Sequence, residues 1–530
     1  MSSYFFLDMK IAQDAKNDTV NLALDTIKRD KQALVFVNSK RSAQKQAIEI
    51  SRVSNMATNE LIELSDKILK AVSSPTDQCK KLAMCVKKGI AFHHAGLNSK
   101  QRTIIEDAFR AGTIKIICST PTLAAGLDMP AFRTILKDMK RFSGNWGMQF
   151  IPVLEYEQMA GRAGRPGKED YGEAILVCGS EKDKDELVEK YVFGDVENIY
   201  SKLAAEPVLR VYVLSLLATR FATDQKSLIA FFKKSFWAKQ FGDIEKLEQI
   251  VTRVVAQLIE WKFVLGSAVG SVDKGFATAA DLLVEHDEPL LVTPLGLRVS
   301  QLYLDPLSAH TLLNGFNKKT HAEFTLVGVL QLMTQALELR PLLRMKKAES
   351  EMVNEFLLAH EEELFGKIPT LYDVDYEDFY HSLKTTAYFV DWLDETGEDS
   401  LLKKYDIRPG EINAKNEMLD WLLYCMSELF HILDKKPDIA FLANIRARLK
   451  YGVREELLPL LKIKGVGRVR ARKLFANGFD SISVLKKSSA NDLAQILGKK
   501  LTVSVLKQLG VEAVVSEDVV SGTTKQTTLF

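Results

Sequence analysis

The feature of this chain that most restricts its fold is a regular alternation of short apolar runs and longer stretches with helical spacing. The runs are 33–37, 90–92, 114–118, 134–136 and 174–177. Strands that alternate with helices pair in parallel, and the helices then cover the sheet. Ligands of such sheets bind at the carboxyl ends of the strands. We therefore predict an α/β domain whose site residues directly follow the apolar runs.

The rest of the chain has mostly helical periodicity. Helical stretches followed by a short strand-like turn at 289–296 indicate a winged helix, and short helices surround a Gly-Val-Gly turn near the C-terminus. The predicted fold is multidomain α/β plus α. Its parts are a parallel-sheet domain at 1–198, a winged helix at 199–304, a helical bundle at 305–452, a helix-hairpin-helix-like domain at 453–510 and a flexible tail at 511–530.

Composition mainly excludes functions. A net charge of +2 over 530 residues means that any basic nucleic-acid footprint must be local. Five cysteines without a CxxC pair, and the lack of an HExxH motif, favour a reducing cytosol and argue against structural zinc. We expect no bound metal in this chain. No apolar run reaches about 18 residues and no signal-peptide pattern opens the chain, so we expect a cytoplasmic protein.

The sharpest single motif is QMAGRAGR at 158–165. Helical spacing would place Arg162 and Arg165 on one face, with small residues between them. Two planar guanidinium groups on one face suit a triphosphate, and an arginine at a γ-phosphate can accelerate transfer by roughly 10³–10⁵-fold. The alternative is a surface helix whose arginines form salt bridges.

Three further motifs precede the arginine motif in a fixed order. They are LVFVNS at 34–39, FHHAGL at 92–97 and STPTLAAGLDMP at 119–130. The series resembles motifs IV, IVa, V and VI of the second RecA-like domain of superfamily 2 helicases. Within the Ski-two-like branch it is most similar to the archaeal Hjm-type DNA helicases, and the resemblance covers essentially the whole chain.

The resemblance implies a role for each motif. The residues on the nucleotide side would be Arg162, Arg165, Gln158, Gly126 and Asp128. The residues that touch the nucleic-acid backbone would be Ser39, His94, Gly96, Thr120 and Thr122. Hydroxyl and backbone N–H groups are ordinary phosphate partners, which agrees with the second set. For each of these residues, a plain turn-capping role is the alternative.

A β-hairpin is predicted at 140–150, where Gly-Asn and Gly lie among aromatic residues. In the resembled family a hairpin at this place splits the duplex. Such a wedge needs an exposed apolar tip that replaces base stacking. The candidates are Phe142, Trp146 and Phe150, and the alternative is that they are buried against the domain.

Two motor motifs are absent from the sequence. No Gly-Lys pair is followed by Ser or Thr as in GxxxxGK[ST], and no acidic pair completes DExH or DExD. The resembled family would carry both motifs upstream. We therefore expect ATP and Mg²⁺ to bind productively only together with a first motor domain from outside this sequence.

One helix of the bundle carries a possible base-stacking residue. Its apolar stripe consists of Leu419, Leu422, Leu423, Met426, Leu429, Phe430 and Leu433. Trp421 lies about 150° from this stripe. In the resembled family this is the ratchet helix, whose aromatic stacks on single-stranded bases. Glu417 and Glu428 share the face of Trp421 and would oppose phosphate; packing against a neighbouring helix is the alternative for Trp421.

Two elements near the C-terminus predict partners. Residues 462–473 hold six basic and no acidic residues, and the turn resembles a helix-hairpin-helix. Its predicted DNA-binding residues are Gly465, Gly467, Arg468, Arg470 and Arg472, against the alternative of a solvated basic face. The last residues resemble a peptide that docks on the sliding clamp PCNA, through Gln526, Leu529 and Phe530.

Two functions remain open from the sequence. The first is the C-terminal part of a 3′-to-5′ DNA helicase that acts on forked or recombination DNA, with an RNA helicase of the same branch as a rival. The second is a catalytically incomplete module that binds nucleic acid or a clamp. The first implies a nucleoid-associated protein, and only the first needs ATP.

Overall fold

The computed structural model describes residues 10–72, 75–124, 126, 129–142, 147–164, 169–203, 205–266 and 289–511. The chain divides into two compact units, which are described separately. Unit 1 comprises Met1–Ile199 together with Ile407–Asn413, and unit 2 comprises Tyr200–Asp406 together with Ala414–Phe530.

Unit 1 is built on a five-stranded sheet in the order β2-β3-β1-β4-β7. The strands are β1 (Ala33–Phe36), β2 (Ile90–His93), β3 (Ile116–Ser119), β4 (Arg133–Leu136) and β7 (Glu173–Leu176). All four pairings are parallel. Every residue of β1 to β4 is buried, as expected for a parallel sheet covered on both faces. The predicted strands and the α/β class are confirmed.

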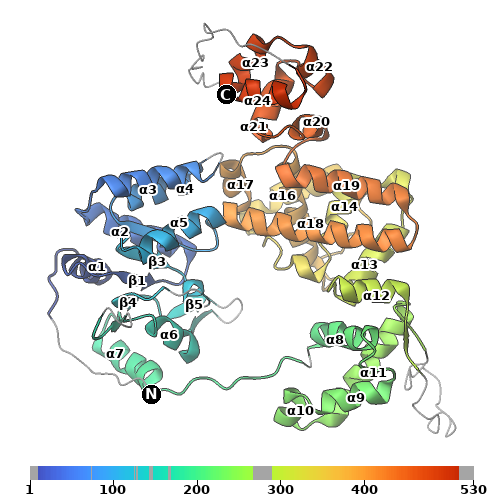
Figure 1. The fold of residues 1–530 in the computed structure, drawn as a ribbon. Coiled ribbons are helices and arrows are strands. Elements are labelled where there is room, and N and C mark those ends of the chain that lie inside the picture. Colours follow the sequence, from blue (N-terminus) through green and yellow to red (C-terminus); the bar gives the residue numbers. More distant parts are fainter. Residues whose placement is uncertain are drawn as a thin grey trace. The chain divides into compact units, whose positions relative to one another are not determined.

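Helices connect and surround these strands (Figure 1). They are α1 (Asp18–Lys28), α2 (Lys40–Val53), α3 (Asn59–Lys70), α4 (Asp77–Val86), α5 (Ser99–Arg110), α6 (Val153–Ala160) and α7 (Glu181–Leu187). Side chains of Ser39, Thr58, Thr76 and Asn98 accept backbone N–H groups at the starts of α2 to α5. These caps fix where each helix leaves the sheet edge.

Unit 2 begins with a helical group and a short ribbon. The helices are α8 (Glu206–Ala218), α9 (Gln225–Lys233), α10 (Phe236–Phe241), α11 (Ile244–Glu260) and α12 (Pro294–Gln301). Strand β8 (Val264–Leu265) pairs antiparallel with β9 (Leu291–Val292) just before α12. The predicted sequence of helices followed by a ribbon is confirmed.

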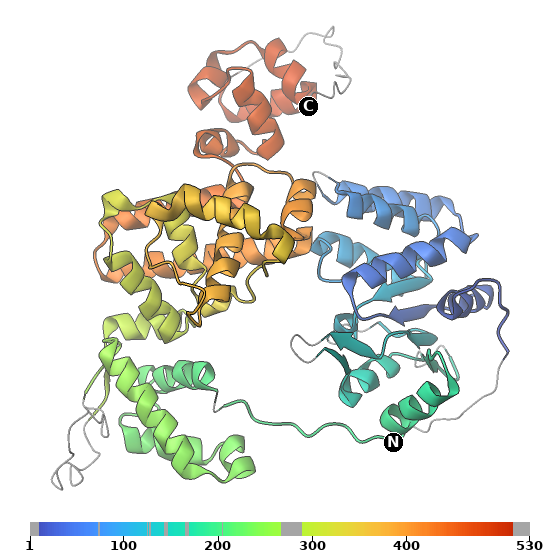
Figure 2. The same cartoon turned by 180° about the vertical axis from the view of Figure 1, so that it is seen from behind.

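The bundle and the C-terminal group of unit 2 are helical. The bundle contains α13 (Pro306–Asn317), α14 (Leu326–Met333), α15 (Ser350–His360), α16 (Tyr376–Leu393), α17 (Glu398–Tyr405), α18 (Pro409–Ile432) and α19 (Lys436–Tyr451). The first turn of α18 clusters with unit 1. The C-terminal group, red in Figures 1 and 2, contains α20 (Leu458–Leu461), α21 (Arg468–Ala476), α22 (Ile482–Lys487), α23 (Ala490–Leu497) and α24 (Lys499–Gln508).

The apolar stripe of α18 is buried from Leu419 to Phe430. Leu433 departs from the prediction, because its side chain is 40% exposed just past the end of the helix. Among the described residues, no helix has both the length and the apolarity needed to cross a bilayer.

Candidate nucleotide and nucleic-acid sites

Three predicted site segments lie at one edge of the sheet of unit 1. Phe36 and His93 both pair with Ser119, so β1, β2 and β3 end level with one another. Ser39, the loop 94–97 and Thr120 follow these three strand ends directly. The sheet therefore brings the segments together at its carboxyl edge, where ligands of parallel sheets bind.

Hydroxyl groups populate this edge. Ser39 caps α2, since its Oγ accepts from the backbone N–H of Ser42 (3.1 Å). The hydroxyls of Thr120 and Thr122 lie 2.9 Å apart, and Thr122 is exposed. Ser39 thus has the capping role that the sequence left open, whereas the threonine pair presents hydroxyl groups to solvent. Whether any of these three residues binds phosphate stays a prediction.

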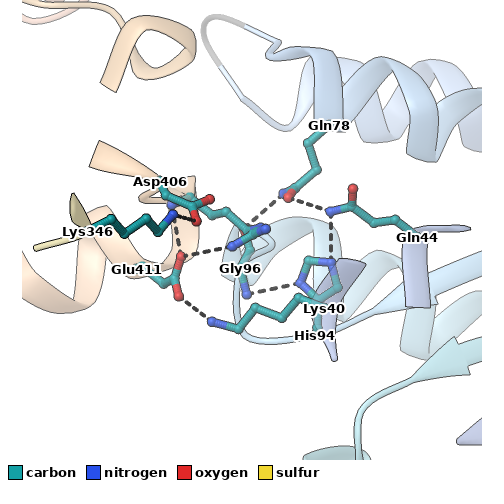
Figure 3. Close-up of polar contacts among 9 residues, drawn as sticks. Lys40, Gln44, Gln78, His94, Gly96, Lys346, Asp406 and Glu411 are labelled. Carbon is teal, nitrogen blue, oxygen red and sulfur yellow. Dashed lines mark hydrogen bonds and ion pairs between the residues drawn. The ribbon is translucent and has the colours of Figure 1, made fainter. Parts of the chain in front are cut away.

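His94 is fully buried and lies in a network of neutral groups (Figure 3). Its Nδ1 accepts from the backbone N–H of Gly96 (3.1 Å), and its Nε2 lies 3.1 Å from Nε2 of Gln44. Burial lowers the pKa of His94 to about 3, and the positive charges of Arg408 and Lys40 contribute. The imidazole is therefore neutral near pH 7.

Both the backbone N–H and the backbone carbonyl of Gly96 form hydrogen bonds. Its N–H donates to His94, and its carbonyl oxygen accepts from Gln78 Nε2 (2.9 Å) and from the backbone N–H of Gly410 (3.2 Å). A Cβ on Gly96 would lie 2.6 Å from Cδ of Arg408. Contact of His94 or Gly96 with a phosphate therefore requires this network to open.

Sequence reasoning missed the segment that covers this loop. In unit 1, Glu411 forms an ion pair with Lys40, and it accepts from the backbone N–H of Arg408 (2.9 Å). The only local signal is that Arg408 and Glu411 have the spacing of a helix cap. Lys40 and Glu411 are 371 positions apart, so their pairing is invisible in one sequence.

Arg162 is connected to the segment 119–130. Its guanidinium donates to the carbonyl oxygen of Ala124 from Nη2 (2.5 Å) and Nε (3.2 Å). Its own carbonyl accepts from the N–H of Ala131 (2.9 Å). Helix α6 ends at Ala160, so the prediction that Arg162 lies on a helical face is wrong. The structure instead joins the arginine motif to the motif after β3.

The other nucleotide-side residues are partly described. Gln158 is exposed on α6. Gly126 has φ of +87°, and among the described residues no heavy atom beyond its chain neighbours lies within 4 Å of where its Cβ would be. Asp128 and Arg165 lie outside the described residues.

The predicted hairpin is present as β5 (Lys140–Phe142) paired antiparallel with β6 (Met148–Phe150). Phe150 packs inward, edge-on to Tyr191 (6.3 Å), with Nζ of Lys140 4.2 Å from its ring centroid. Phe150 thus follows the buried alternative. Met148, which the sequence analysis overlooked, is 54% exposed. Trp146 and the side chain of Phe142 lie outside the described residues.

On α18, Trp421 is partly buried, on the side away from the apolar stripe. Next to it, Asp420 forms an ion pair with Arg446 (2.9 Å). The carboxylate of Glu428 is paired with Arg298 of α12. The negative charge of Glu428, which would oppose phosphate on the face of Trp421, is therefore largely neutralised.

The Gly-Val-Gly turn opens α21. Gly465 has φ of +94°, which favours glycine, and Gly467 is the N-cap residue. The N-cap residue Gly467 makes no side-chain cap bond to the first turn of α21, so backbone N–H groups there can donate to an anion. This geometry agrees with the predicted helix-hairpin-helix.

The three arginines of α21 differ in their surroundings. Arg468 lies over the ring of Trp392 (5.1 Å), and burial lowers its pKa. Arg472 forms ion pairs with Glu395 and with Glu456 (2.9 Å). Arg470 is exposed, as are Lys462, Lys464 and Lys473. The charge that faces solvent therefore comes from Arg470 and the lysines.

No group of three or more His, Cys, Asp or Glu side chains able to hold a metal ion occurs in the part of the chain that the structure describes. The predicted clamp-binding residues Gln526, Leu529 and Phe530 lie outside that part.

Four known families match successive parts of the chain. Residues 15–167 match the helicase conserved C-terminal domain, and 172–265 match a helix-turn-helix domain. Residues 327–452 match archaeal helicase domain 4, and 457–510 match a SAM-like helix-hairpin-helix tandem. The predicted fold class and order of domains are confirmed, while the boundaries at 198, 304 and 452 stay predictions.

Curated relatives bear the name ATP-dependent DNA helicase Hel308. The relative from Methanocella arvoryzae is 37% identical over 96% of this chain and 66% of its own length. Those from Methanococcus vannielii and Pyrococcus horikoshii are 35% and 33% identical, over 94% and 98% of this chain and 68% and 70% of their own lengths. The chain thus spans about two thirds of these relatives, and the resemblance to an archaeal DNA helicase family is confirmed. The chain belongs to the Hel308 family.

Proposed function

We propose that this chain supplies the second motor domain and the DNA-handling domains of an ATP-dependent 3′-to-5′ DNA helicase. Its substrates would be forked or recombination DNA in repair and replication restart. The observation that carries the proposal is the bond from Arg162 to the Ala124 carbonyl. It joins the residue proposed to sense nucleotide to the segment that presents Thr120 and Thr122. A nucleotide-dependent movement of Arg162 would thereby reach a nucleic-acid-facing edge.

The residues of this chain fit one side of a nucleotide site. Gln158 is exposed, and no described heavy atom beyond the chain neighbours of Gly126 lies within 4 Å of a Cβ at that position. Hydrolysis of ATP would supply the free energy for strand movement, with Mg²⁺ at the phosphates. Because the sequence holds no GxxxxGK[ST] or DExH motif, we propose that a first motor domain from outside these 530 residues grips the phosphates.

ATP hydrolysis with forked DNA tests the proposal, first with the chain alone and then with a separately supplied first motor domain. We expect DNA binding without turnover by the chain alone, and turnover in the complemented pair. Arg162→Ala should abolish that turnover without loss of DNA binding. Turnover by the chain alone would contradict our assignment of the phosphate-gripping residues.

The same assay separates the alternatives. Binding of DNA without turnover in any complemented pair would favour a nucleic-acid-binding or clamp-docking module. Faster turnover with forked RNA than with forked DNA would favour an RNA helicase. Loss of PCNA binding after removal of 526–530 would support the clamp-docking peptide.

A further inference from the structure

Two cations share one carboxylate at the carboxyl edge of the sheet of unit 1. Glu411 forms ion pairs with Lys40 and, at 3.8 Å, with Nη1 of Arg408. Figure 3 shows the Glu411 carboxylate facing the Lys40 ammonium. The side chains of Lys40 and Glu411 are 31% and 32% exposed, and that of Arg408 is 13% exposed. Within this cluster two cations therefore face one carboxylate, and the Lys40–Glu411 pair is partly exposed to solvent.

The surroundings of this cluster favour an anion. Lys40 opens α2, four residues after β1 ends at Phe36, and Thr120 follows the end of β3, which is level with that of β1. The charges of Arg408 and Lys40 both help to lower the pKa of buried His94, so both fields reach the loop 94–97. His94 itself is neutral near pH 7 and adds no charge to the cluster. The positive charge of both groups thus acts on the loop that follows β2, at the edge where we propose that nucleic acid runs.

We propose that Lys40 and Arg408 form a binding site for a backbone phosphate of single-stranded nucleic acid, and that Glu411 occupies this site as an internal competitor. The inference rests on the proposed function and adds one contact between the protein and the nucleic-acid backbone. A carboxylate and a phosphate accept the same charge-assisted hydrogen bonds from ammonium and guanidinium groups. Partly exposed ion pairs are weak, so a phosphate can displace the carboxylate.

The test is binding of a fluorescent single-stranded oligonucleotide by the full chain and by Glu411→Gln. Glutamine keeps an oxygen that can accept from the Arg408 N–H, so the start of α18 is preserved. We expect E411Q to bind about three- to tenfold more tightly at low salt. One additional phosphate contact should steepen the slope of log affinity against log salt by roughly 0.7.

A matched control is Asp107→Asn. Asp107 is paired with Arg110 (2.8 Å) in the last turn of α5, which leads to the opposite edge of the sheet. The control changes the net charge as E411Q does, and we expect it to leave affinity nearly unchanged. If both variants gained affinity equally, the gain would come from the change in net charge alone, and the proposal would be overturned.

Lys40→Ala supplies the second arm. The gain from E411Q should disappear in the double variant K40A/E411Q, because the freed site has lost its ammonium. Persistence of the full gain in the double variant, or no gain in E411Q, would overturn the proposed site. Failure of the unaltered chain to bind any single strand would instead refute the proposed function itself.

Discussion

Substitution of Gly410 by alanine tests how tightly the first turn of α18 holds the loop after β2. A Cβ at this position would lie 2.0 Å from the Ala95 carbonyl oxygen and 2.6 Å from that of Leu97. Backbone atoms cannot swing aside as a side chain does. The turn must therefore move away, although alanine is the better helix former by about 1 kcal/mol.

The loss of stability caused by Gly410→Ala depends on the contacts that are broken when the turn moves away. They are the hydrogen bond from Gly410 to Gly96 and the ion pair between Lys40 and Glu411. With about 0.5–1.5 kcal/mol for the first and about 0.2–1 kcal/mol for the second, the loss is about 0.7–2.5 kcal/mol. Amide exchange at 94–97 and 407–413 should then accelerate by roughly 3- to 70-fold.

Hydrogen exchange read by mass spectrometry measures this effect. Gly397→Ala is the control, since no described heavy atom beyond the chain neighbours of Gly397 lies within 4 Å of a Cβ there. As water reaches the loop, the pKa of His94 should also rise from about 3 toward its ordinary value of 6.5, which NMR of the imidazole detects. Unchanged exchange and an unchanged His94 pKa in Gly410→Ala would refute the packing argument.

Three further predictions concern the other sites. Trp421→Ala should weaken single-strand binding by about 1–3 kcal/mol if the ring stacks on a base, and unchanged affinity would make it structural. Arg470→Ala should lower DNA affinity and reduce its salt dependence, whereas Arg472→Ala should chiefly lower the melting temperature, because only Arg472 is paired with internal carboxylates. The free energy of unfolding should fall as pH drops from 6.5 toward 3, by at most about 4–5 kcal/mol, because the unfolded state protonates His94 before the folded state does. His94→Gln, followed by thermal unfolding, should flatten that pH dependence.

The strands could be predicted because continuous apolar runs in the sequence indicate strands that are buried on both faces. Runs such as 90–92 and 114–118 are apolar without alternation, and β2 and β3 are buried along their whole length. The order of motifs then fixed which residues reach the carboxyl edge. Local composition sufficed for these features because each depends on one segment at a time.

The placement of Arg162 failed for a reason that is also local. The spacing of the two arginines predicts that they lie on one face of a helix, but the motif also contains Gly161 and Gly164. Helix α6 ends before Gly161, and Gly164 takes a φ of +91° that a helix does not allow. Glycine costs about 1 kcal/mol in a helix interior, so the two glycines outweighed the periodicity.

Which charged side chains pair with one another, in contrast, could not be predicted from the sequence. Residues 462–473 contain basic but no acidic residues, yet Arg472 is neutralised by Glu395, which lies 77 positions away. Lys40 and Glu411 are farther apart still. Composition counts charges, whereas affinity for a phosphate depends on which charges have internal partners.

Under the proposed function, this division of charge would let a nearly neutral chain hold a polyanion without binding it too firmly. Glu411 is paired with Lys40 of the proposed phosphate site, and Glu428, on the face of Trp421, is paired with Arg298. An internal carboxylate makes the binding free energy of such a surface less favourable by as much as its ion pair contributes, and each 1.4 kcal/mol lowers the affinity about tenfold. A translocating protein must release each phosphate that it binds, and tight, permanent contacts would oppose release. Internal competitors would therefore set an affinity low enough for movement, and their removal should tighten binding of the strand while slowing its release.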